Sequence, residues 1–219
     1  MSVKNILCTM LALGLSVSAA YAAPSVNRSG SSVIVKESLT DEGLSQAREI
    51  AGSIKTPEFK LEGVKDADLA KFCQAFPNAS RLSVKGGLTS IAPVAGLKNL
   101  TYFELEANNV TDMSPLAKLT QLTRISLKSE KMGPDLKWMT GLTALREIEI
   151  NAGSALTSFE GFPALKGDPR VALNGASPAD LSPLKSLGSS KLELRYCTIQ
   201  DLSPLASMPN LRELSLYGA

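Results

Sequence analysis

The sequence predicts an α/β solenoid in which a strand and a short helical return alternate along the chain. Within residues 100–127, apolar side chains first alternate with a period of two, as in a strand, and then recur every three residues, as in a 3₁₀ return. The strand position recurs at spacings of 21 to 23 residues, at Leu61, Val84, Leu105, Leu127, Ile150, Leu173, Leu194 and Leu216. A second large apolar residue precedes each of them by two positions, and such self-similarity is typical of repeat architectures.

Residues 1–22 are predicted to be a secretory signal peptide. They combine one basic residue, Lys4, with an apolar run over 6–17 and the A-x-A pattern Ala20-Tyr21-Ala22. The run is too short for a retained membrane helix, so no membrane span is expected. These features predict an exported protein that is either periplasmic or secreted.

The next two segments precede the repeats. Residues 23–38 are predicted to be a flexible linker because Ser, Asn, Gly and Pro dominate their first part, although 33–35 could form a short edge strand. Residues 39–57 are predicted to form an N-terminal helical cap, with Thr40 as the N-cap and Pro57 as the stop. Such a cap would cover the open end of the first coil. The repeats then occupy 58–219.

Two motifs resemble the leucine-rich repeat family. Residues 100–108 follow L-x-x-L-x-L-x-x-N with Phe103 at the second apolar position, and Asp-x-Ser-Pro-Leu occurs at 112–116, 180–184 and 201–205. The second motif is similar to internalin-like bacterial proteins with repeats of about 22 residues. The resemblance covers residues 59–219 and implies a parallel sheet on a concave face, returns on the convex side, and protein binding. The position of Asn108 holds other residues in the other coils, so the family's asparagine ladder is nearly absent.

The repeat pattern predicts whether two cysteines and the tryptophan are buried or exposed. Cys73 and Cys197 lie six coils apart, which corresponds to roughly 29 Å at about 4.8 Å per strand, too far for a disulfide. Both are therefore predicted to be free, buried and structural. Trp138 takes the place of proline at the start of its return and is predicted to lie on the outer surface.

Composition excludes several kinds of chemistry. The chain has no histidine and no Cys-x-x-Cys, Gly-x-Gly-x-x-Gly, Walker or calcium-loop pattern, so neither a cofactor nor a metal is predicted. Loss of residues 1–22, whose one charged residue is Lys4, would lower the net charge from +2 to +1. This balance argues against nucleic-acid binding.

The side chains that flank the inward apolar residues of each strand are predicted to face outward on the concave sheet. Their charges alternate in sign from strand to strand. Two interpretations remain: a ladder that neutralises itself, or a surface that binds a protein partner of complementary charge. The candidate partner-binding residues are Arg81, Lys85, Tyr102, Glu104, Glu106, Arg124, Lys128, Glu147, Glu149, Arg170, Lys191, Arg195, Tyr196 and Tyr217.

The sequence therefore predicts an exported, non-enzymatic protein-recognition module with an unidentified protein partner. One alternative is a self-assembling structural protein, possible as a homodimer, that pairs through the C-terminal strand 213–217. Another is a glycan hydrolase that uses Glu104 and Glu149, about 9.6 Å apart across Ser126, as a carboxylate pair. The open face and the neighbouring Arg124 argue against the hydrolase.

Overall fold

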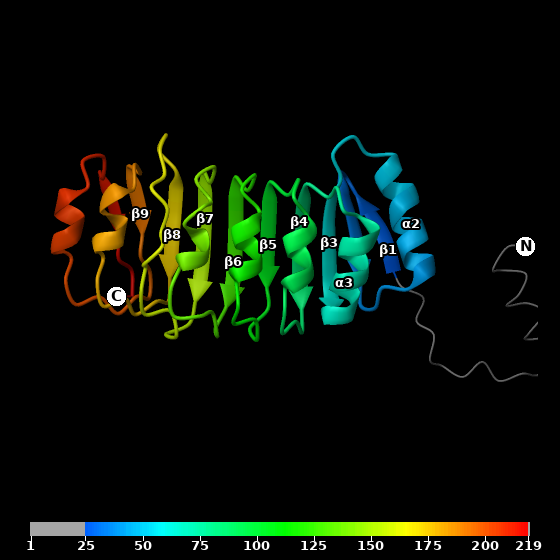
Figure 1. The fold of residues 1–219 in the computed structure, drawn as a ribbon, viewed down its shortest axis with the longest axis horizontal. Coiled ribbons are helices and arrows are strands. Elements are labelled where there is room, and N and C mark those ends of the chain that lie inside the picture. Colours follow the sequence, from blue (N-terminus) through cyan, green and yellow to red (C-terminus); the bar gives the residue numbers. More distant parts are fainter. Residues whose placement is uncertain (1–24, 219) are drawn as a thin grey trace, which may run out of the picture.

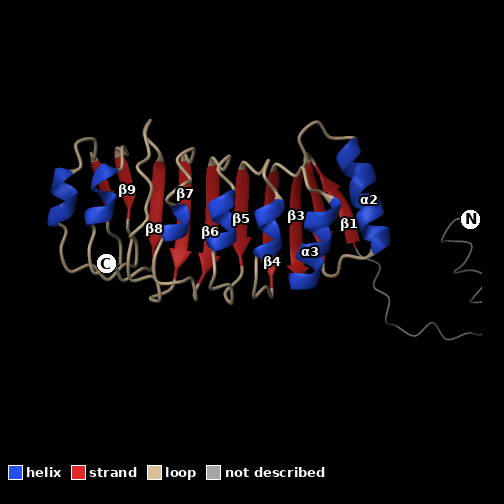
Figure 2. Ribbon diagram, in the orientation of Figure 1, coloured by secondary structure: helices blue, strands red, loops and turns tan. Residues whose placement is uncertain are grey.

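The computed structural model describes residues 25–218, which form one sheet of ten strands in chain order (Figure 1). Every neighbouring pair is parallel except β1 and β2, and the helical returns lie along one side of the sheet (Figure 2). The predicted leucine-rich-repeat solenoid, with a concave parallel sheet and convex returns, is confirmed.

The elements are β1 (Ser25–Ser29), β2 (Ser32–Lys36), α2 (Asp41–Gly52), β3 (Glu58–Val64), α3 (Asp66–Ala75), β4 (Arg81–Gly86), η1 (Ala92–Gly96), β5 (Tyr102–Glu106), η2 (Ser114–Lys118), β6 (Arg124–Ser129), η3 (Lys137–Met139), β7 (Glu147–Ala152), β8 (Arg170–Asn174), η4 (Ser182–Ser186), β9 (Lys191–Glu193), η5 (Ser203–Ser207) and β10 (Glu213–Ser215).

The inward apolar residues stack in columns through the solenoid. Leu105 lies beside Val84 on β4 and beside Leu127 on β6, and Leu127 lies in turn beside Ile150 on β7. All four side chains are buried. Full burial of such a side chain contributes roughly 1.5–3 kcal/mol, so columns that continue through every coil supply much of the stability. The predicted register of these positions is confirmed.

The motif Asp-x-Ser-Pro-Leu begins a 3₁₀ return in three coils. The Asp112 carboxylate accepts a hydrogen bond of 2.8 Å from the backbone N–H of Ser114, the first residue of η2. The next residue, Pro115, has no N–H and therefore adds no unsatisfied donor. Asp180 and Asp201 accept the equivalent bonds in their coils, also at 2.8 Å, and these bonds lower the pKa of both carboxyl groups.

The N-terminal segment differs from the sequence prediction. Residues 23–38 were expected to be a flexible linker, but 25–36 form the hairpin β1–β2, which turns at Gly30 with φ +58°. Val33 and Val35 are buried beside Phe59 and Leu61 of β3, so β2 behaves as a first coil strand. Because β1 pairs on its other side, β2 is not the edge strand that was expected at 33–35.

The predicted helical cap corresponds to α2, which packs against β1 and β2 at the N-terminal end of the sheet (Figure 1). The Thr40 hydroxyl accepts a hydrogen bond of 3.1 Å from the N–H of Gly43, as an N-cap does. The predicted signal peptide over 1–22 lies outside the described residues.

The position that the family's asparagine ladder would occupy is exposed in some coils and buried in others. Asn108 is exposed, so it is not a buried ladder residue even in its own coil. Cys197, at the equivalent position, is buried and its thiol donates to the carbonyl oxygen of Leu173 at 3.2 Å. Cys73 is also buried and free, and burial raises its pKa to about 12. The prediction of two structural, unreactive thiols is consistent with these surroundings.

Trp138 is half-buried and packs against the core, whereas the sequence predicted a position on the outer surface. The indole Nε1–H is buried, and no hydrogen-bond acceptor of the described chain lies within reach.

Replacement of Trp138 by phenylalanine is expected to change the free energy of unfolding by less than about 1 kcal/mol. An unsatisfied buried N–H costs about 1–3 kcal/mol, so its removal offsets the smaller apolar area of phenylalanine. Urea unfolding followed by circular dichroism measures the effect, with Trp138→Ala as the control that loses the packing. Equal destabilisation by both variants would contradict the claim that the indole N–H lacks a partner.

Candidate functional site: the concave face

The outward side chains of the strands form three columns along the concave face. They are brought into register by the parallel pairing of the strands. The first column contains Glu58, Arg81, Tyr102, Arg124, Glu147, Arg170, Lys191 and Glu213. The central column contains Lys60, Ser83, Glu104, Ser126, Glu149, Ala172, Glu193 and Ser215. The third column contains Glu62, Lys85, Glu106, Lys128, Asn151, Asn174, Arg195 and Tyr217.

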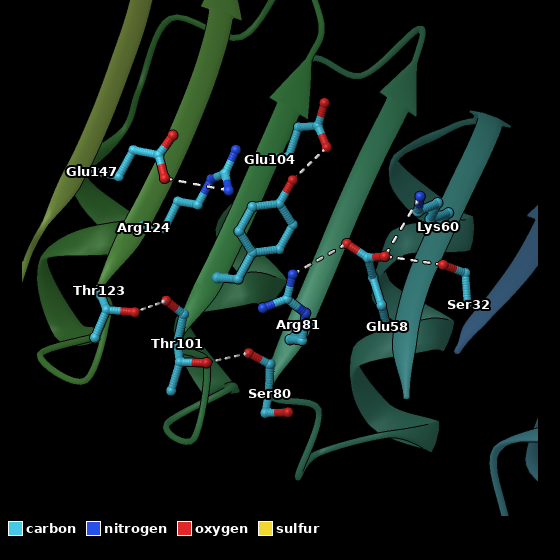
Figure 3. A network of polar contacts seen from close by, with 11 residues as sticks. Ser32, Glu58, Lys60, Ser80, Arg81, Thr101, Glu104, Thr123, Arg124 and Glu147 are labelled. Carbon is cyan, nitrogen blue, oxygen red and sulfur yellow. Dashed lines mark hydrogen bonds and ion pairs between the residues drawn. The ribbon is translucent and has the colours of Figure 1, made fainter. Parts of the chain in front are cut away.

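Ionic and aromatic contacts connect the first column from β3 to β7 (Figure 3). Arg81 Nη2 lies 3.6 Å from a carboxylate oxygen of Glu58, and the Arg81 guanidinium lies 4.5 Å from the centroid of the Tyr102 ring. The Arg124 guanidinium lies 5.3 Å from the same centroid. Arg124 Nη1 then lies 3.3 Å from a carboxylate oxygen of Glu147. The two arginines are thus held on either side of one aromatic ring, where a cation–π contact contributes about 0.5–1 kcal/mol.

The Tyr102 ring lies beneath the guanidinium groups of Arg81 and Arg124. Tyr102 is 8% exposed, and its hydroxyl donates a hydrogen bond of 2.7 Å to the Glu104 carboxylate. Burial, followed by that bond to a carboxylate, raises the pKa of the phenol, so the hydroxyl stays protonated and remains a donor. The sequence predicted Tyr102 as a contact residue; the structure places Arg81 and Arg124 over its ring and makes them the more accessible groups.

Glu106 connects two lysines in the third column. Lys85 Nζ lies 2.7 Å from one carboxylate oxygen, and Lys128 Nζ lies 3.0 Å from the other. The hydrogen bonds from both lysines lower the pKa of Glu106, and Glu106 in turn raises the pKa of Lys85. All three side chains are largely in water, where such pairs contribute about 0–1 kcal/mol each. This cluster fits the neutralising ladder that the alternating charges suggested.

The Glu106 carboxyl group is expected to titrate below the ordinary glutamate value of about 4.3. A lowered pKa means that the folded state favours the ionised form, so any stabilisation is present above the unfolded-state pKa and disappears as pH falls through the folded-state pKa. Carbon-13 NMR of the carboxyl carbon measures the titration. The variant Lys85→Gln with Lys128→Gln should move the pKa of Glu106 upward, and no movement would contradict the assignment.

The C-terminal part of the face contains a buried carboxylate. Glu193 is 6% exposed, and its carboxylate lies 2.8 Å from Arg195 Nη2 and 3.8 Å from Lys191 Nζ. Lys191 also lies 2.7 Å from Glu213 on β10. Lys191 and Arg195, both predicted contact residues, therefore neutralise a carboxylate of the sheet itself. Glu193 belonged to the predicted outward positions, but its burial depends on the two long side chains that fold over it.

An amide pair on β7 and β8 was missed among the candidates. Asn174 donates to the Asn151 side-chain oxygen at 3.0 Å, and Asn151 donates to the Glu149 carboxylate at 3.1 Å. The Asn174 oxygen also accepts from the backbone N–H of Arg195 at 3.2 Å. The signal in the sequence was asparagine at the same position of two consecutive coils.

Two exposed tyrosines lie at the C-terminal end of the face. Tyr196 and Tyr217 are 62% and 71% exposed, and their rings pack edge to face with centroids 5.6 Å apart. Tyr196 has a φ of +57°, a left-handed conformation that costs about 1–3 kcal/mol in a residue other than glycine. Both predicted tyrosines reach solvent.

A hollow of about 300 Å³ opens around Ala172 in the C-terminal half of the face. It includes Glu149 but not Glu104, so the two carboxylates considered for glycan hydrolysis do not share one pocket. Within 25–218, no cluster of acidic and cysteine side chains is arranged to hold a metal ion. No helix in that range is long and apolar enough to cross a bilayer.

A solved structure of an internalin shares this architecture. An internalin, InlF, of Listeria monocytogenes aligns with a TM-score of 0.58 at 18% sequence identity, over 86% of this chain and 61% of that one. The internalin InlC2 of the same organism aligns over 85% of this chain and 80% of its own at 21% identity, with a TM-score of 0.47. The sequence matches no protein-family model and no curated protein. The fold is thus that of an internalin-type leucine-rich-repeat protein, and the chain spans less than two thirds of the length of InlF.

Proposed function

We propose that this protein is an exported, non-enzymatic recognition module that binds a protein partner through the mixed-charge concave face. Export follows from the predicted signal peptide over 1–22, which would deliver the mature chain to the periplasm or release it. Leucine-rich-repeat solenoids offer a broad and rigid surface of this kind.

The observation that carries the proposal is the continuous run from Glu58 to Glu147. Its arginines are held by Tyr102 on one side and by carboxylates on the other, with ion-pair distances of 3.6 Å and 3.3 Å. Side chains that are already ordered lose little conformational entropy on binding. Arginine and tyrosine are also the residue types enriched where interface residues contribute most to affinity.

The alternation of charge restricts the kind of partner. A uniformly acidic or basic surface would meet repulsion at every second strand, whereas a surface of alternating sign would be complementary. The near-zero net charge also gives little long-range attraction for nucleic acid. The partner is therefore a protein with a patterned surface of both signs.

Capture experiments test this proposal. Mature protein, residues 23–219, is immobilised and exposed to envelope extracts of the source organism and to candidate host cells. Simultaneous Arg124→Ala and Glu149→Ala substitutions should weaken capture about tenfold or more, because each removes a charged group of the face. The matched control, Glu42→Ala with Lys118→Ala, removes one charge of each sign from exposed positions of α2 and η2. Capture that survives the concave substitutions but is lost in the control would place the binding surface on the cap or the returns.

Self-assembly is a second candidate because apolar side chains are exposed near β10. Leu214 on β10 is 36% exposed, and Leu202, which precedes η5 in the same coil, is 42% exposed. Light scattering at high protein concentration separates the two candidates. A dimer that Leu216→Lys abolishes would favour assembly, and a monomer at every concentration would exclude it.

A further inference from the structure

The hollow around Ala172 is built by a small residue between two long ones. Ala172 lies in register between Glu149 on β7 and Glu193 on β9, and it is only 9% exposed. The space of about 300 Å³ above it is at the lower limit of pockets that hold small ligands. It is large enough for one or two side chains of a partner.

Most charged groups around this hollow already have partners. Arg124 pairs with Glu147 at 3.3 Å, and Arg195 pairs with the buried Glu193 at 2.8 Å. Because these four side chains are already paired with one another, they are less available to bind a charged group of a partner.

Arg170 and Glu149 are the exceptions. Within residues 25–218, the Arg170 side chain makes neither an ion pair nor a hydrogen bond, although it lines the hollow. Glu149 has no ion pair in that range either and accepts only from Asn151 at 3.1 Å and Ser126 at 3.4 Å. Within the described residues, the hollow thus presents one cation without a polar side-chain partner and one anion that is hydrogen-bonded but has no ion-pair partner.

The spacing of these two groups suits an extended chain. Arg170 is in the first column of β8 and Glu149 in the central column of β7, so they are offset by one strand of about 4.8 Å and two residues of about 3.3 Å each. Residues i and i+2 of an extended peptide project on one side at about 6.6 Å, a span that flexible side chains can adjust. A guanidinium binds a carboxylate in two parallel hydrogen bonds, which favours an acidic side chain at Arg170.

We propose that the Ala172 hollow is the specificity pocket of the concave face, and that it receives an extended partner segment carrying an acidic and a basic residue separated by one residue. The acidic side chain binds Arg170 and the basic one binds Glu149. This inference rests on the proposed function. Segments of a single charge are disfavoured because three groups of each sign line the hollow, namely Arg124, Arg170, Arg195, Glu147, Glu149 and Glu193.

Four synthetic peptides with the same neutral flanks and the centres Glu-Ala-Lys, Gln-Ala-Lys, Glu-Ala-Gln and Gln-Ala-Gln test the pocket. Each is titrated into nitrogen-15-labelled mature protein, and the Ala172 amide and Arg170 Nε signals are followed by NMR. The Glu-Ala-Lys peptide should shift both signals and bind roughly tenfold more tightly than either peptide with one charge.

Three variants make the test specific. Ala172→Leu fills the hollow and should abolish the shifts, whereas Ser83→Leu places the same side chain in the central column of β4, outside the hollow, and should preserve them. Arg170→Gln alters an exposed side chain and should remove the preference for the acidic residue.

Any of three results would contradict the proposed pocket. These are equal binding of all four peptides, no shift at Ala172 with any peptide, and unchanged binding to the Ala172→Leu variant. The pocket can fail while the proposed function stands. If Arg124→Ala with Glu149→Ala loses the captured partner while Ala172→Leu retains it, the concave face binds the partner without this pocket.

Discussion

Replacement of Tyr102 by alanine is expected to lower the free energy of unfolding by about 3 kcal/mol and to weaken partner capture as well. Removal of a buried aromatic side chain leaves a cavity, which accounts for the loss of stability. The same change removes the ring that lies 4.5 Å and 5.3 Å from the guanidinium groups of Arg81 and Arg124. Both arginines then become mobile, and ordering them again would cost free energy on binding.

The control for this prediction is Tyr102→Phe. It keeps the ring and loses only the 2.7 Å hydrogen bond to Glu104, so a loss of about 1 kcal/mol and near-normal capture are expected. Urea denaturation and the capture assay measure the two effects. If alanine and phenylalanine variants capture the partner equally well, Tyr102 does not position the arginines.

Replacement of Gly175 by alanine is expected to cost roughly 2–5 kcal/mol, because two penalties add. Gly175 has a φ of +77°, which other residues adopt only with strain, and an added Cβ would collide with the carbonyl oxygen of Ala152 in the preceding coil. The coils therefore approach too closely at this turn for any side chain.

Gly141→Ala is the matched control, since nothing lies within 4 Å of a Cβ built there and its φ is not in the left-handed region. Its effect on the free energy of unfolding should stay within about 0.5 kcal/mol. Thermal or urea unfolding measures both variants. Similar stability for the two would contradict the close packing of the coils after β8.

The repeat pattern allowed the fold to be predicted because the same physical requirement recurs in each coil. A single register places Leu105, Leu127 and Ile150 in one buried column, and a shift by one residue would expose them. The repeat pattern does not extend to the hairpin β1–β2, so it could not predict these strands. The burial of Val33 and Val35 is decided by their pairing with β3, which local composition does not reveal.

The positions of the candidate site were predictable, but the contacts between its side chains were not. Strand alternation indicated that Tyr102 and Glu193 face the concave side. Their burial depends on how Arg81, Arg124 and Arg195 extend over them, and these conformations follow from neighbours on other strands. Sequence periodicity carries no information on these side-chain conformations. The sequence therefore could not show that Arg170 and Glu149 lack ion pairs while the other charged groups of the hollow have them.

Carboxyl footprinting of the complex tests the central claim most directly. Mature protein is labelled with a carbodiimide and an amine, with and without the captured partner, and each carboxylate is quantified by mass spectrometry. Binding through the concave face predicts protection of Glu104, Glu147 and Glu149, with Glu42 on α2 and Glu160 among the returns unchanged. Protection of Glu42 or Glu160 with full labelling of the three concave carboxylates would contradict it.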